Sequence, residues 1–154
     1  MNYIVSDGFP YYISLVGTSQ VTGLFTAQSN FRLLGSLTEK QMTHRYAPDK
    51  WSIKQIIGHM TDHERIMTYR ALRFSRKDPT LLPGYDQELF VNNSRFDQMM
   101  SSELLLDFRN VRQATISLMN SFSADQLQLK GKAWKFELTV EEMLKATMGT
   151  NSII

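Results

Sequence analysis

The segment from Ser52 to Phe74 carries the longest helical pattern in the chain. Its apolar residues recur every three or four positions and form one stripe, made of Ile53, Ile56, Ile57, Met60, Met67, Ala71 and Phe74. Ser52 and Gln55 have the spacing of a capping box, and Asp78-Pro79 ends the pattern. Such a helix is roughly 38 Å long at about 1.5 Å per residue. Because a rod of that length must bury its stripe against other helices, the pattern predicts a helical bundle.

Three further helices are expected, over residues 19–35, 101–122 and 139–149. Ser101 or Ser102 is expected to cap the helix over residues 101–122. Thr139 and Glu142 have the capping-box spacing for the helix over residues 139–149. Gly149 is expected to end the third helix, because glycine is a common residue just beyond a helix C-terminus.

The remaining segments are interpreted as connections. Residues 1–17 are rich in aromatic residues and interrupted by glycine and proline, which indicates an N-terminal arm packed on the body. Residues 79–98 are expected to be a loop with a turn at Pro83-Gly84 and one helical turn near residues 87–91. Residues 127–138 are compatible with an extended segment but show no hairpin signal. The predicted fold class is therefore all-α.

Composition fits one soluble domain over residues 1–154, with 42% hydrophobic and 21% charged residues. The 17 basic and 15 acidic residues give a formal net charge of +2 without a basic run, so a nucleic-acid partner is not expected. The lack of cysteine excludes disulfides, cysteine-ligated metals and a cysteine nucleophile. Neither a secretory signal nor a membrane-spanning run is recognisable, so we expect a cytoplasmic protein without a membrane partner.

Two of the three histidines, His59 and His63, are four residues apart on the long helix. Their rings therefore lie about one turn apart on one face, at the border of the apolar stripe. Two histidines at this spacing can share a divalent metal. The alternative is that both are boundary residues whose nitrogens bond to water or to polar neighbours. Trp51 and Trp134 likewise either line a pocket or anchor the ends of helices.

Glu64 lies near the same stripe, where a carboxylate needs a partner. Arg70 or Arg112 can supply one. A structural ion pair is the favoured interpretation of Glu64, and a catalytic role is the alternative.

Several short motifs together resemble the DinB-like (YfiT-type) four-helix-bundle superfamily. They are Tyr46-Ala47-Pro48-Asp49-Lys50-Trp51-Ser52-Ile53-Lys54, Gly58-His59, Asp62, Glu64-Arg65, Tyr69-Arg70-Ala71-Leu72, Pro83-Gly84-Tyr85-Asp86, and Phe108-Arg109 with Val111-Arg112. The resemblance covers about residues 10–149, nearly the whole chain. It implies an up-down-down-up bundle that is often a homodimer. It also implies a divalent metal, frequently nickel or zinc, held by three histidines, and hydrolase or thiol-transferase-like activity.

The chain departs from this family at the last helix. The resemblance assigns the first metal ligand to His59, whereas the other two belong to a Gly-His-Glu-x-His-His motif, where this chain has Thr150 and Ile154. His63 is a substitute second donor, but two histidines on one helix still leave a catalytic site short of a protein ligand. Either the tail results from a shifted reading frame or truncation, or the protein has lost its metal. We expect the metal to be absent or weakly bound in this chain.

Two functions remain open. The first is a metal-dependent hydrolase or thiol-transferase-like enzyme, with His59 as metal ligand and Glu64 or Asp86 as base or orienting group. The second is a non-catalytic, metal-free bundle that binds a small molecule or a partner chain, and the incomplete histidine set favours it. A shortened last helix would also leave apolar surface uncovered, so we expect a homodimer.

Overall fold

The computed structural model describes residues 2–26 and 29–151. Its α-helices are α1 (Phe9–Val16), α2 (Val21–Thr26), α3 (Ser29–Gly35), α4 (Glu39–Met42), α5 (Ile53–Ser75), α6 (Gln87–Asn92), α7 (Ser101–Asn120), α8 (Ala124–Leu127) and α9 (Val140–Asn151). Two 3-10 turns, η1 (Val5–Asp7) and η2 (Phe96–Gln98), and two strands, β1 (Lys130–Ala133) and β2 (Phe136–Thr139), complete it. None of the described helices is long and apolar enough to cross a membrane.

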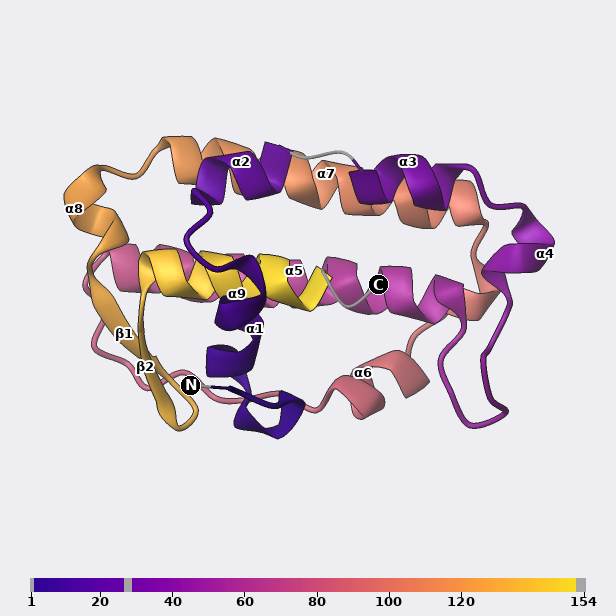
Figure 1. Ribbon diagram of the computed structural model, residues 1–154, viewed down its shortest axis with the longest axis horizontal. Coiled ribbons are helices and arrows are strands. Elements are labelled where there is room, and N and C mark those ends of the chain that lie inside the picture. Colours follow the sequence, from indigo (N-terminus) through magenta and orange to yellow (C-terminus); the bar gives the residue numbers. More distant parts are fainter. Residues whose placement is uncertain (1, 27–28, 152–154) are drawn as a thin grey trace.

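The body is a four-helix bundle in which α2 and α3 together form the first rod and α5, α7 and α9 form the others (Figure 1). The chain runs one way along α2 and α3, returns along α5, runs parallel to α5 again along α7, and reverses in α9. The parallel pair needs a connection that travels the length of the bundle, and residues 76–100 with α6 provide it. The expected up-down-down-up topology is confirmed, with a last helix of 12 residues beside 23 in α5.

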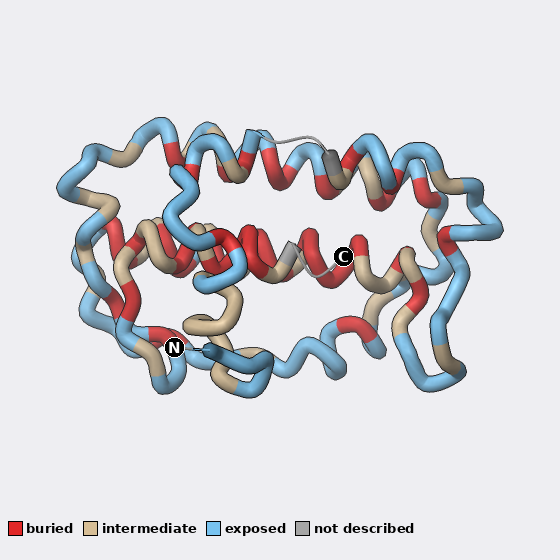
Figure 2. Tube along the Cα trace, viewed as in Figure 1, coloured by how far each residue is buried: buried red, intermediate tan, exposed pale blue. Residues whose placement is uncertain are grey.

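Apolar side chains form two buried clusters within the bundle. Buried residues recur along the rods of the bundle (Figure 2). Within α5, Ile57 and Met60 belong to one cluster, whereas Met67, Ala71 and Phe74 belong to the other. The predicted stripe of α5 is therefore the face that enters the core.

A buried ion pair lies between these two clusters. The guanidinium of Arg112 donates to both carboxylate oxygens of Glu64, over 3.0 Å from Nε to Oε1 and 2.9 Å from Nη2 to Oε2. The same guanidinium lies 5.1 to 5.6 Å from the ring centres of Phe25, Phe31 and Phe108. Glu64 is completely buried, so direct hydrogen bonds from Arg112 take the place of water around its carboxylate, and three aromatic rings surround the guanidinium.

Two capping boxes have the predicted residues. At α5, Gln55 N donates to Ser52 Oγ and Ser52 N donates to Gln55 Oε1, each over 3.0 Å. At α9, Thr139 and Glu142 make the same reciprocal bonds. The expected cap of α7 by Ser101 or Ser102 is wrong, because the helix already begins at Ser101.

The N-cap of α7 is Met100 instead, and its N–H donates to the Glu103 carboxylate over 2.9 Å. Ser101 uses its hydroxyl to bond Glu39 Oε2 over 2.5 Å, which ties the start of α7 to α4. Of the helix expected over residues 19–35, the structure describes α2 and α3, and residues 27 and 28 lie outside the described part.

The structure contains a hairpin over residues 130–139, where the sequence shows no hairpin signal. Strands β1 and β2 pair antiparallel, with Ala133 opposite Phe136, so Trp134 and Lys135 form the turn. Tight hairpin turns favour asparagine and glycine, because they require a positive φ. Here Trp134 adopts φ 53°, so the usual sequence signal is missing. Gly131 in β1 lies so close to the ring of Phe74 that a Cβ there would be 1.9 Å from it.

The N-terminal arm contains α1, which crosses α9 and packs on it (Figure 1). Gly149 lies at this crossing and does not end α9, which continues to Asn151. A Cβ on Gly149 would lie 1.9 Å from the carbonyl oxygen of Tyr12. Glycine is therefore required at position 149 by the close approach of the α1 and α9 backbones, not by the end of a helix. For this reason the predicted helix end is wrong.

We predict that Gly149→Ala lowers the free energy of unfolding by about 1–3 kcal/mol, because α1 must move away from α9. Gly23→Ala is the matched control, since Gly23 is also helical but nothing lies within 4 Å of the position that its Cβ would take. That variant is expected to gain up to about 1 kcal/mol of stability from helix propensity. Urea unfolding followed by circular dichroism measures both, and equal effects would contradict the close approach.

We also predict that Arg112→Met lowers the free energy of unfolding by about 3–5 kcal/mol, because it leaves the buried Glu64 carboxylate without its partner. Arg65→Met is the control, since the Arg65–Asp107 pair is exposed to solvent and is expected to contribute at most about 1 kcal/mol. Chemical denaturation of both variants tests this difference. A loss at Arg112 no larger than that at Arg65 would show that the buried pair is dispensable.

Candidate functional site

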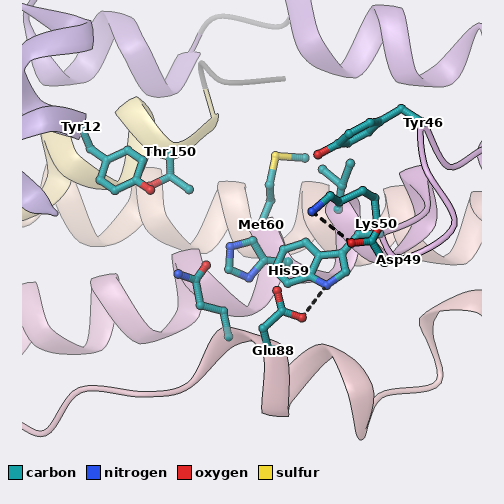
Figure 3. A pocket seen from close by; sticks show the side chains of 11 residues that line it. Tyr12, Tyr46, Asp49, Lys50, His59, Met60, Glu88 and Thr150 are labelled. Carbon is teal, nitrogen blue, oxygen red and sulfur yellow. Dashed lines mark hydrogen bonds and ion pairs between the residues drawn. The ribbon is translucent and has the colours of Figure 1, made fainter. Parts of the chain in front are cut away.

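A pocket of about 450 Å³ opens where the loop before α5 meets α1, α6 and the end of α9 (Figure 3). Its lining residues are Tyr12, Tyr46, Asp49, Lys50, Trp51, Ile56, His59, Met60, Gln87, Glu88 and Thr150. We call it the His59 pocket. Because its walls come from five separate segments, the bundle must be fully assembled for the pocket to exist.

His59 is the buried polar group of this pocket. The residue is only 7% exposed, and its ring packs 4.8 Å from the ring centre of Trp51. Burial lowers the pKa of His59 to about 4, so the imidazole is neutral at pH 7. Within the described part of the chain, neither ring nitrogen has a hydrogen-bond partner. The neutral ring therefore offers one donor and one acceptor to the pocket.

His63, one turn further along α5, has partners for both ring nitrogens. Nδ1 lies 2.6 Å from the hydroxyl of Tyr85, and Nε2 lies 3.2 Å from the hydroxyl of Thr150. The Thr150 hydroxyl also donates to the carbonyl of Ala146 over 3.1 Å. A consistent assignment therefore has Tyr85 O–H donating to Nδ1, and Nε2–H donating to Thr150.

The surroundings of His63 keep this ring neutral. Burial, the neighbouring His59 and the Arg70 guanidinium together lower the pKa of His63 to about 3. Burial also raises the pKa of the Tyr85 hydroxyl, so that it remains a donor. Arg70 itself donates to the carbonyl of Pro83 over 2.6 Å, whereas Glu64 is bound by Arg112.

The donor set of the described residues does not fit a three-histidine metal centre. His59 has free nitrogens, but His63 is engaged on both sides, and Thr150 is one of its partners. No group of three His, Cys, Asp or Glu side chains in residues 2–26 and 29–151 is arranged to hold a metal ion. Ile154, the other expected ligand position, lies outside the described residues.

The two carboxylates expected as candidate catalytic groups lie elsewhere. Glu64 is bound to Arg112 in the core, and Asp86 caps α6 by accepting the Leu89 N–H over 3.1 Å. Neither lines the His59 pocket. The structure brings Glu88 there instead, and its carboxylate accepts the indole N–H of Trp51 over 3.1 Å. The sequence contains no local signal for this contact, because it depends on where the crossover places α6.

We predict that the protein loses stability as the pH falls from 7 to 5. An unfolded histidine titrates near pH 6.5, whereas the folded pKa is about 4 for His59 and about 3 for His63. The unfolded chain then binds protons that the folded chain does not, so each buried imidazole contributes a slope of about 1.4 kcal/mol per pH unit below pH 6.5. The expected loss by pH 5 is about 3–4 kcal/mol.

Urea denaturation at several pH values measures this loss. His63→Gln is expected to remove about half of the pH dependence, because it removes one of the two buried imidazoles. A wild-type profile that is flat between pH 7 and 5 would contradict the burial of neutral imidazoles.

Comparisons with known proteins agree on the fold. YfiT from Bacillus subtilis, described as a probable metal-dependent hydrolase with an unusual four-helix bundle topology, is similar in structure with a TM-score of 0.67 and 14% sequence identity. The match covers 99% of this chain and 84% of YfiT, and at this identity it shows the fold alone. No similar sequence was found among curated proteins. The family model of the DinB superfamily matches residues 25–149, and the chain therefore belongs to the DinB superfamily.

Proposed function

We propose that this protein binds a small organic molecule in the His59 pocket and does so without a resident three-histidine metal. The observation that carries this proposal is the state of His59, a buried imidazole without a partner for either nitrogen in the described part of the chain. A buried polar group without a hydrogen bond destabilises the fold by about 1–3 kcal/mol. A ligand in the pocket would supply the missing bond.

The dimensions and lining of the pocket support this proposal. Small-molecule sites typically measure about 300–1,000 Å³ and combine apolar or aromatic walls with a few polar groups. The His59 pocket, at about 450 Å³, has Trp51 and two tyrosines in its walls. Its polar groups are few and come from different elements, which allows them to fix the orientation of a bound molecule.

The second candidate is a metal-dependent hydrolase or thiol-transferase-like enzyme. Membership of the DinB superfamily and the likeness to YfiT favour it, and His59 is an imidazole whose nitrogens are available. It would require ligands beyond those that the described residues bring together. The expected homodimer and the cytoplasmic location stay predictions.

We predict that some members of a chemically diverse fragment library stabilise the protein in a thermal-shift screen in the presence of a chelator. A ligand at about 100 times its Kd adds about 2.7 kcal/mol of stability. His59→Ala is expected to abolish the shift because it removes the polar wall of the pocket. His44→Ala, at an exposed histidine in the segment before α5, is expected to retain it.

Elemental analysis of untagged protein distinguishes the two candidates. The first candidate requires ligand binding that survives removal of metal. Near-stoichiometric nickel or zinc that is lost in His59→Ala, together with no fragment binding in chelator, would contradict it and support the metal-dependent enzyme.

A further inference from the structure

We propose that the ligand of the His59 pocket is a small organic ammonium ion, a primary amine with an aromatic or apolar body. This inference rests on the proposed function and adds the chemical class of the ligand that the pocket binds. It follows from the charges that line the pocket, the free acceptor at His59 and the aromatic walls.

The charges of the lining leave one carboxylate without a cation. Asp49 and Glu88 are its acidic residues and Lys50 is its basic residue. Lys50 Nζ lies 3.4 Å from the Asp49 carboxylate, so these two charges offset each other. Glu88 forms no salt bridge with any described residue. Since its carboxylate accepts a single hydrogen bond, from the Trp51 indole, it retains acceptor capacity toward the pocket.

Glu88 and His59 contact the same side chain and so lie at the same end of the pocket. The Trp51 indole donates to Glu88 over 3.1 Å, while its rings pack 4.8 Å from the imidazole of His59, measured between ring centres. An ammonium group has three donors and no acceptor. It matches a carboxylate oxygen together with the acceptor nitrogen of a neutral imidazole, and its bond to the carboxylate is charge-assisted.

The aromatic side chains of the pocket favour the same ligand class. Trp51, Tyr46 and Tyr12 line it, and the faces of such rings attract cations. Tyr46 is 77% exposed, which places it at the mouth, where it can cover the apolar body of a ligand. A carboxylate ligand would instead be repelled by the charge of Glu88. The basic residue of the lining, Lys50, is already paired with Asp49 and offers it little attraction.

Three molecules of similar size test the proposal on the full chain by isothermal titration calorimetry. They are 2-phenylethylamine, which is cationic at pH 7, 2-phenylethanol, which is neutral, and phenylacetate, which is anionic. We expect the amine to bind about tenfold or more tightly than the alcohol, and the anion to bind most weakly. An alcohol or an anion that binds as tightly as the amine would overturn the proposal.

Glu88→Gln is the specific variant, because glutamine keeps an acceptor for Trp51 but removes the charge. We expect it to weaken the amine about tenfold and to leave binding of the alcohol unchanged. Glu137→Gln is the matched control, since Glu137 is an exposed residue of β2 outside the pocket. Equal affinities of the two variants for the amine would also overturn the proposal.

The two proposals fail in different ways. If neutral or anionic fragments bind at His59 and amines do not, the pocket is a ligand site but the ammonium assignment is wrong. If no fragment of any charge binds, both proposals are wrong.

Discussion

The bidentate pair between Glu64 and Arg112 determines how the bundle presents its other polar groups. It lies where the two apolar clusters meet, and its guanidinium touches aromatic rings from both. Because Glu64 must face α7, the rotation of α5 about its own axis is fixed. Successive helical residues are about 100° apart, so His63 and His59 are turned away from α7 toward the flank where α9, α6 and the loop before α5 converge. The pocket therefore lies on a different side of α5 from the core pair.

Hydrogen bonds at His63 join three segments that lie far apart in the sequence. Tyr85 comes from the crossover, His63 from α5 and Thr150 from α9, and the two contacts link all three segments. Such a buried network is stable only when every member is satisfied, and here each hydroxyl and each ring nitrogen has a partner. In this chain neutral side chains link α5, α9 and the crossover at this point, whereas His59 has no hydrogen-bond partner among the described residues.

Local patterns are sufficient to predict the parts of the fold that depend on neighbouring residues. The stripe and capping box of α5 and the capping box of α9 have the expected residues, because caps and amphipathic faces are set within a few positions. The hairpin escapes prediction since Trp134 adopts a positive φ that its residue type does not signal. For Glu64 the sequence leaves Arg70 and Arg112 open, and only the packing of α7 against α5 selects between them.

The candidate site is less predictable, because its contacts join residues far apart in the chain. His63 and Thr150 are 87 positions apart, and Trp51 and Glu88 are 37 apart, so no spacing rule connects them. The contrast between the two histidines is nevertheless informative. Both lie on one face of α5 and both are buried, yet among the described residues only His63 has partners for its nitrogens. A phenylalanine at position 59 could pack on Trp51 without the cost of an unpaired polar group. The imidazole at position 59 instead brings a polar group to the wall of the His59 pocket.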